Sequence, residues 1–243
     1  VDWLSSTFDL QNEFAQGRNR GRSDRTPYWR SPGTGESSSY GPAITDLEYS
    51  TDPNHPEAPA ASHFDSDGNY LYDKNGFLVA RGTGNGIPGN NYQDNYRGFF
   101  REAMQSLNNL SIQGGTEKAT YAFSTSFLTN EGIVPNEEYG RKTFRLAGTI
   151  KASDKLKLST TFNYVRSDYQ RIQQGSNTSG LMLGLYRTPV SFDNANGFST
   201  EDAVDQRSAY QFANGLQRSY RGNGGYDNPY WLVNNGLRNE TVN

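Results

Sequence analysis

The sequence contains no cysteine among its 243 residues and only two histidines, His55 and His63. The first absence excludes disulfides and thiolate metal sites, and the second excludes a histidine-rich metal centre. Only 33% of the residues are hydrophobic, and no apolar run approaches the roughly 20 residues that a transmembrane helix needs. The net charge of −3 gives no bulk attraction for nucleic acid, so we expect no nucleic-acid partner.

The chain is instead rich in glycine and in aromatic residues, with 26 glycines, 16 tyrosines and 13 phenylalanines. This composition favours strands of alternating polarity joined by long polar loops, and it disfavours a packed helical core. The first residues, Val1 to Leu4, have neither the basic nor the apolar segment of a signal peptide. We therefore expect the chain to be a piece of a longer protein.

The clearest pattern is the stretch from Lys155 to Tyr164, in which apolar and polar residues alternate. A period of two predicts a strand with one apolar and one polar face. The same pattern predicts strands near residues 107–114, 117–129, 141–152 and 155–168, and a less regular one near 4–15. Between them we predict tight turns at 114–117 and 152–154 and a medium loop at 129–136.

The connections are very unequal, because loops 16–106 and 169–243 are long while two of the others are tight turns. Short turns at one end of a sheet and long loops at the other are typical of outer-membrane β-barrels. The strands are also close to the 9–11 residues that cross a bilayer at a tilt. A soluble antiparallel β-sandwich would show the same alternation, so the pattern by itself leaves both folds open.

Within the long loops we predict two small elements. The segments Tyr70–Tyr72 and Phe77–Val79, with the turn residues 73–76 between them, are typical of a hairpin. Residues 178–186 are apolar enough for one short helix, which should end before Pro189. A connection as long as 16–106 is expected to be functional or to form a subdomain.

Several segments resemble, in order, the SusC/RagA family of TonB-dependent outer-membrane transporters of Bacteroidetes. The matching segments are Ser39–Pro42, Asn109–Lys118 with Tyr121–Ser124, Glu131–Asn136 with Tyr139, Arg141 and Arg145, Leu156–Ser167, Arg187–Pro189 with Phe192 and Asp193, and Asp227–Trp231. They run from about residue 39 to residue 231 and so cover most of the chain.

The resemblance implies an all-β fold: an antiparallel transmembrane β-barrel segment of about five strands from a larger barrel, with long irregular extracellular loops. It implies import of oligosaccharides or peptides across the outer membrane. The implied partners are a SusD-like surface lipoprotein, TonB acting through an N-terminal region, outer-membrane lipid, and the remaining barrel and plug of the same transporter. The plug and the N-terminal domains of that family are absent from this sequence. The alternative remains a soluble secreted β-sandwich that binds glycans.

If the even positions of the strands face lipid, the odd positions place a set of basic side chains in the lumen: Arg141, Arg145, Lys151, Lys155 and Lys157. One interpretation is a basic wall that steers anionic substrate inward. The other is that these side chains pair with carboxylates of the plug or of neighbouring strands.

Aromatic residues of the loops are candidates for contact with substrate or partner, because exposed tyrosine and tryptophan favour interfaces. We name Tyr28, Trp29, Tyr40, Tyr92, Tyr96, Tyr186, Tyr230 and Trp231, together with Arg187. Packing of the loops against one another would explain the same residues.

No cofactor is expected. Asp65, Asp67, Asn69 and Asp73 invite a calcium interpretation, but the spacing fails the EF-hand template, and we interpret the segment as consecutive turns. We also expect no enzyme, because no nucleophile with its base, no phosphate-binding glycine loop and no pair of carboxylates in an apolar pocket is indicated.

Overall fold

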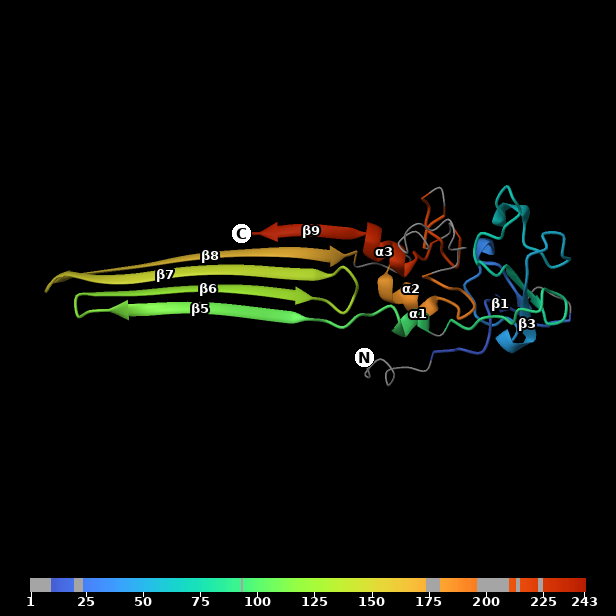
Figure 1. The fold of residues 1–243 in the computed structure, drawn as a ribbon, viewed down its shortest axis with the longest axis horizontal. Helices are drawn as coiled ribbons and strands as arrows, with labels where there is room; N and C mark the ends of the chain where they lie inside the picture. Colours follow the sequence, from blue (N-terminus) through green and yellow to red (C-terminus); the bar gives the residue numbers. More distant parts are fainter. Residues whose placement is uncertain are drawn as a thin grey trace. The chain divides into compact units, whose positions relative to one another are not determined.

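The computed structural model describes residues 10–19, 24–92, 94–173, 180–195, 210–212, 215–222 and 225–243. Its described part is predominantly β with antiparallel pairing, which confirms the predicted fold class at that level. The chain divides into two compact units, one comprising residues 100–172 and 237–243 and the other residues 1–99 and 173–236. Figure 1 labels their elements.

The first unit is a five-stranded antiparallel sheet in the order β5-β6-β7-β8-β9. Its strands are β5 (Gln105–Gly115), β6 (Ala119–Glu131), β7 (Glu138–Ser153), β8 (Leu156–Ile172) and β9 (Leu237–Val242). The four strands predicted between residues 107 and 168 are present, and each extends beyond its predicted bounds at the open end, while β6 and β8 begin two residues and one residue later than predicted. The strand β9 lies in what the sequence indicated was loop, and it pairs with residues 167–172 of β8.

Local chemistry sets the two tight turns. Thr116 closes the first, where its backbone N–H donates to the Ala119 carbonyl at 2.6 Å and its hydroxyl accepts from the Lys118 and Ala119 backbone N–H groups. The second turn, Asp154–Lys155, follows a register shift between Lys151 and Ser153. Such bulges are common at barrel rims. We call this side of the sheet the turn end, and the side of the 132–137 connection the open end.

The second unit contains the two-stranded sheets β1 (Gly17–Arg18) with β2 (Tyr28–Trp29) and β3 (Leu47–Ser50) with β4 (Phe77–Ala80). It also contains the short helices α1 (Asp94–Arg97), α2 (Leu181–Arg187) and α3 (Pro229–Asn235), and the 3₁₀ turns η2 (Pro32–Thr34), η3 (Ile44–Asp46) and η4 (Ala61–His63). The predicted helix near 178–186 is confirmed as α2, although residues 178 and 179 lie outside the described part.

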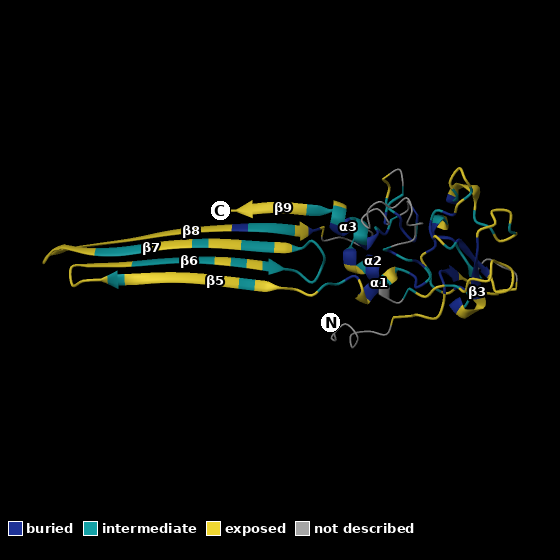
Figure 2. Cartoon of the chain, viewed as in Figure 1, coloured by how far each residue is buried: buried dark blue, intermediate teal, exposed yellow. Residues whose placement is uncertain are grey.

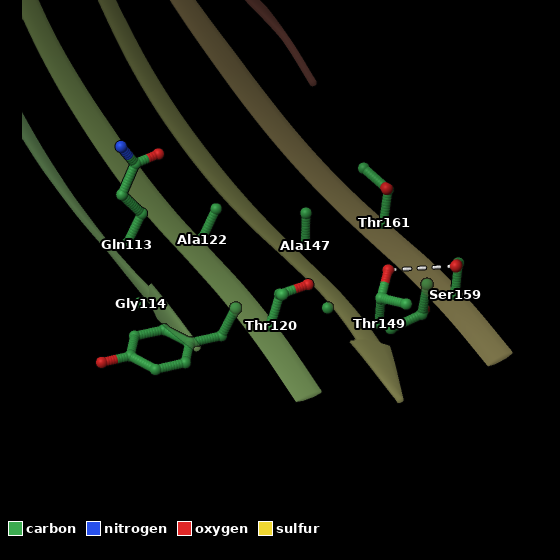
Figure 3. Close-up of a pocket in the computed structure, with 11 residues that line it drawn as sticks. Gln113, Gly114, Thr120, Ala122, Ala147, Thr149, Ser159 and Thr161 are labelled. Carbon is green, nitrogen blue, oxygen red and sulfur yellow. Dashed lines mark hydrogen bonds between the residues drawn. The ribbon is translucent and has the colours of Figure 1, made fainter. Parts of the chain in front are cut away.

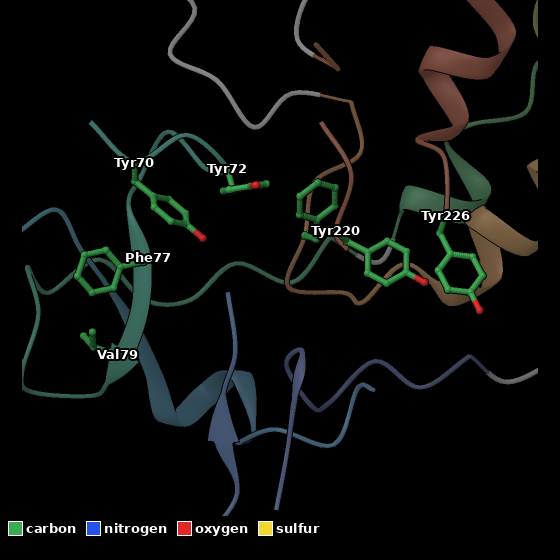
Figure 4. Close-up of a cluster of buried hydrophobic side chains, with 7 residues drawn as sticks. Tyr70, Tyr72, Phe77, Val79, Tyr220 and Tyr226 are labelled. Atoms are coloured by element: carbon green, nitrogen blue, oxygen red, sulfur yellow. The ribbon is translucent and has the colours of Figure 1, made fainter. Parts of the chain in front are cut away.

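The long loops are therefore more than irregular connections, because they enclose a core of their own. One buried cluster is unusually rich in tyrosine and comprises Tyr70, Tyr72, Phe77, Val79, Phe192, Tyr220 and Tyr226 (Figure 4). Tyr70 and Phe77 meet edge to face with ring centroids 5.9 Å apart, whereas Tyr220 and Tyr226 are stacked. A second cluster gathers around Ile44, Leu47, Tyr49 and Leu78. The low content of aliphatic residues hid this core from the sequence patterns.

Two predictions do not hold for the described residues. Of the strand expected near 4–15, residues 4–9 lie outside the described part, and 10–15 hold only an isolated bridge from Phe14 to Ala43. The Gln11 side chain explains this, because its carbonyl oxygen accepts from the backbone of Glu13 and Phe14 at 2.6 and 2.5 Å and so competes with a ladder.

The hairpin of 70–72 with 77–79 was also wrong, because Phe77–Ala80 pairs with Leu47–Ser50 instead. The turn between them does form: Gly76 donates its backbone N–H to the Asp73 carbonyl, and Asn75 donates to the Asp73 carboxylate. Tyr70 and Tyr72 instead direct their side chains into the core (Figure 4), so burial of the rings decides the pairing.

Candidate functional site

The five-stranded sheet has one apolar face, and the register of the strands aligns its side chains in rows. Leu146 lies opposite Phe123 and Phe162, and the next row toward the open end places Phe144 opposite Tyr164. Phe123 is half-buried and the other four are exposed, with Phe162 at 56% and Leu146 at 45%. Figure 2 shows exposed segments along the strands of this sheet. No second sheet of comparable size exists among the described residues. The β-sandwich alternative required these side chains to be buried, and they are not.

The opposite face is polar, is formed mainly by small side chains, and is hollowed. A cavity of about 450 Å³ lies on it, lined by Gln113, Thr120, Ala122, Ala147, Thr149, Ser159 and Thr161, with Gly114, Tyr121, Gly148 and Thr160 beside them (Figure 3). Within it the Thr149 and Ser159 hydroxyls are 3.0 Å apart. We call this cavity the polar hollow. Its hydroxyl groups can exchange hydrogen bonds with water or a polar solute.

At the turn end a second cavity of about 440 Å³ collects four lysines, Lys118, Lys151, Lys155 and Lys157, with the carboxylates of Glu117 and Asp154. We call it the lysine hollow. Lys151 lies directly opposite Lys157, and its ammonium is 3.2 Å from Asp154. Because the four ammonium groups outnumber the two carboxylates, the hollow carries an excess of positive charge.

The register assigns four of the five basic candidates to the polar face: Arg141, Arg145, Lys151 and Lys157. The fifth, Lys155, lies in the turn outside the ladder, because the bulge takes up the alternation, and yet it lines the same hollow as Lys151 and Lys157. Arg141 and Arg145 lie farther toward the open end. Whether this face borders a lumen stays a prediction.

In the second unit, Tyr28 and Trp29 border a cleft of about 460 Å³, which we call the Trp29 cleft. Its other lining residues are Pro27, Pro42, Asp46, Leu47, Pro56, Glu57, Leu78, Val79 and Ala80. Aromatic rings beside carboxylates are suited to a ligand with an apolar ring face and hydroxyl or amino groups at its edge. Sequence reasoning named the two aromatic residues and missed Asp46 and Glu57, which only the fold brings near them.

Tyr28 belongs to a charged cluster at the edge of this cleft. Its hydroxyl accepts hydrogen bonds from Arg18 and Arg30 at 3.4 and 3.5 Å, and these bonds lower the pKa of Tyr28. Both guanidinium groups also lie within 3.5 Å of the largely buried carboxylate of Glu36. The cluster fixes Tyr28 on β2, and so holds the neighbouring Trp29 in place.

Most other aromatic candidates have structural partners. The Tyr92 hydroxyl donates to the Asp73 carboxylate at 2.9 Å, and Tyr96 stacks on Tyr186 with ring centroids 5.0 Å apart. Tyr230 packs edge-on against Phe99, and Arg187 lies over the ring of Tyr226. Trp231 is partly buried on α3, whereas Tyr40 is 72% exposed. Tyr28, Trp29 and Tyr40 are therefore the best placed of the set to meet a ligand.

Sequence reasoning missed a buried polar network around Asp73. This carboxylate accepts from the hydroxyls of Tyr49 and Tyr92, and burial raises its pKa. Nearby, the fully buried guanidinium of Arg218 donates to the carbonyls of Tyr72 and Asp193 and lies over the Phe192 ring. The network stabilises the loops and has no exposed reactive group.

The segment considered for calcium forms local turns. The Asp65 carboxylate accepts from the backbone N–H groups of Asp67 and Asn69 and from the Asn69 amide, while Asp73 takes part in the buried network. Within the described ranges, no three histidine, aspartate or glutamate side chains are grouped as metal ligands would be.

No helix of the described residues is long and apolar enough to cross a membrane. Comparison with known proteins found no protein-family model and no curated protein that matches the chain.

Proposed function

We propose that the five-stranded sheet is an arc of the wall of a transmembrane β-barrel, and that the whole protein is an outer-membrane transporter. The observation that carries this proposal is the pairing of an exposed apolar face with a hollowed polar face on one sheet. Monomeric soluble proteins rarely expose a contiguous apolar surface of this kind. A barrel wall requires one, because its outside meets lipid and its inside meets water.

The dimensions support the same proposal. The apolar positions of β8 run from Leu156 to Tyr164, which is about 27 Å along a strand. At the usual tilt of about 40°, this gives an apolar band about 21 Å tall, close to the band of known barrels. The aromatic side chains of Phe127 and Tyr164 lie on the apolar face toward the open end, where an interfacial girdle would be.

The sheet has two unpaired edges among the described strands. One is the outer edge of β5, and the other is formed by the outer edge of β9 together with residues 156–166 of β8, which β9 does not reach. In lipid each unpaired backbone group costs several kcal/mol, so further strands must continue the wall on both sides. This agrees with the expectation that the sheet is part of a larger barrel.

The resemblance to SusC/RagA transporters supports a finer proposal. On that basis the transporter imports oligosaccharides or peptides, a SusD-like lipoprotein covers its outer opening, and TonB supplies energy through an N-terminal region. The second unit, with its own core, would be the extracellular surface on which the lipoprotein rests. The Trp29 cleft supports a glycan ligand as the second candidate function, since sugar rings stack on aromatic side chains and hydrogen-bond to carboxylates.

Fractionation of the native host tests the proposal. We expect the full-length protein in the outer membrane, insoluble without detergent and resistant to extraction by alkaline carbonate. We also expect a surface lipoprotein to co-purify with it after mild solubilisation. Recovery of the full-length protein in a soluble fraction without detergent would refute the barrel and leave glycan binding, which titration of oligosaccharides against wild type and Trp29→Ala then tests.

A further inference from the structure

On β7 and β8 the apolar positions end at a pair of cations. Row by row toward the open end, Leu146 and Phe162 are followed by Phe144 and Tyr164, and these are followed by Lys142 and Arg166. Successive rows on one face are about 6.7 Å apart. The charge therefore appears one row beyond the aromatic pair, on the same face.

Lys142 and Arg166 are register partners, so their side chains leave the sheet side by side. Like charges directly opposite each other on one face destabilise a strand pair. Both side chains are exposed, and neither contributes to an apolar cluster. An anion that binds between the two cations would replace their mutual repulsion with two attractive, charge-assisted contacts.

The protein itself places only one carboxylate beside the two cations. Arg166 Nε is 3.2 Å from Asp168 Oδ1, the same oxygen that accepts from the Thr241 hydroxyl at 2.8 Å. The remaining neighbours of the pair on this face are Phe127, Tyr164, Phe144 and Gly140, which carry no charge. One carboxylate thus faces two cations, and the excess is one positive charge.

We propose that Lys142 and Arg166 form a binding site for the phosphate of a phosphorylated membrane lipid. The inference rests on the proposed function, because it takes the apolar face to be in contact with lipid. Acyl chains would lie along Phe144, Leu146 and Phe162, and the headgroup would reach the cations one row beyond the aromatic pair. Arginine and lysine are the side chains that bind phosphate oxygens best.

The chain offers a matched control. Lys151 and Lys157 are also directly opposed cations on β7 and β8, but they lie on the polar face. The variant Lys142→Gln/Arg166→Gln removes two charges from the apolar face, and Lys151→Gln/Lys157→Gln removes two from the polar face. The charge-preserving variant Lys142→Arg/Arg166→Lys shows whether the position tolerates exchange.

The experiment measures binding of lipid A, and of lipid A stripped of its phosphates, to the detergent-purified full-length protein by native mass spectrometry. Each cation at an anionic lipid surface strengthens binding about fivefold, so the excess of one positive charge leads us to expect that wild type prefers the phosphorylated lipid by about fivefold. Lys142→Gln/Arg166→Gln should lose this preference, whereas the control and the charge-preserving variant should keep it.

Equal affinity of wild type for both lipids overturns the inference, as does an equal loss in the control variant. Displacement of lipid A by millimolar inorganic phosphate also overturns it, because the site would then recognise phosphate without its lipid. Retention of both lipids without a preference refutes this inference alone. Retention of neither lipid refutes the proposed barrel.

Discussion

Substitutions at Phe162 and Thr161 test, through their effect on stability, whether the apolar face of the sheet contacts lipid. Phe162 lies within the apolar stretch of β8, six residues from its start at Leu156 and two from its end at Tyr164, and it is 56% exposed. Its neighbour Thr161 points to the opposite face and lines the polar hollow. The two positions share a strand and a depth, and they differ in the face that they occupy.

We predict that Phe162→Arg destabilises the full-length protein by about 1–3 kcal/mol, between the costs of arginine near the interface and at the middle of the bilayer on a barrel's lipid face. This corresponds to a change of about 5- to 160-fold in the unfolding equilibrium constant. Thr161→Arg should cost about 1 kcal/mol or less, because its guanidinium meets water and small polar side chains. In water both would be surface substitutions within about 0.5 kcal/mol.

The assay is guanidinium unfolding of the protein reconstituted in phospholipid vesicles, followed by the folded fraction on unheated gels. Phe162→Gln provides a control of intermediate polarity and should fall between the two arginine variants. Equal midpoints for Phe162→Arg and Thr161→Arg would refute the assignment of the apolar face to lipid. A larger loss for Thr161→Arg would indicate the reverse orientation of the sheet.

Three further predictions concern the second unit and the glycines. Arg218→Met should cost about 3–5 kcal/mol, because it leaves buried carbonyls and a buried carboxylate without their cation, and limited proteolysis should show faster cleavage of residues 10–99. Gly76→Ala should lower the thermal unfolding midpoint, since Gly76 has φ of 108° and a Cβ there would lie 2.2 Å from the Ser50 carbonyl oxygen. Gly148→Ala should leave the midpoint almost unchanged, because the atom nearest to its added Cβ would be 3.7 Å away. Burial raises the pKa of Asp73, so the folded state binds the carboxyl proton more tightly than the unfolded state does. Stability should therefore fall as pH rises from the ordinary pKa of 3.8 to the folded pKa. Unfolding midpoints measured against pH should show this fall in wild type, and the fall should disappear in Asp73→Asn.

The sequence predicted the sheet well because its information is local. In β8 the polarity of each side chain indicates the face on which it lies. The alternation from Lys155 to Tyr164 was therefore sufficient to predict the strand and its two faces. The apolar positions of β5, β6 and β7 follow the same rule. The strand β9 was not predicted, because its polar residues lie on both faces and show no alternation with apolar ones. They include Arg238, Asn239 and Glu240.

The structure of the second unit could not be predicted, because it depends on contacts between residues that are far apart in the sequence. Arg218 donates to the carbonyl of Tyr72, 146 residues away, and no local pattern records that bond. Tyr70 and Tyr72 alternate with Leu71 as a strand would, yet the burial of both rings in one core decided their conformation. The Trp29 cleft likewise depends on Asp46 and Glu57, which sequence reasoning had no cause to place beside Trp29.

The most direct test of the central claim is a cysteine scan along β8, which the absence of cysteine from the chain makes simple. Residues 156–166 would be replaced one at a time in the full-length protein, and labelling by a membrane-impermeant maleimide would be measured in intact and in permeabilised outer membranes. Our account predicts that cysteines in place of Leu158 and Phe162 do not react with the aqueous maleimide, while cysteines in place of Ser159 and Thr161 do. Equal aqueous reactivity at odd and even positions would contradict it.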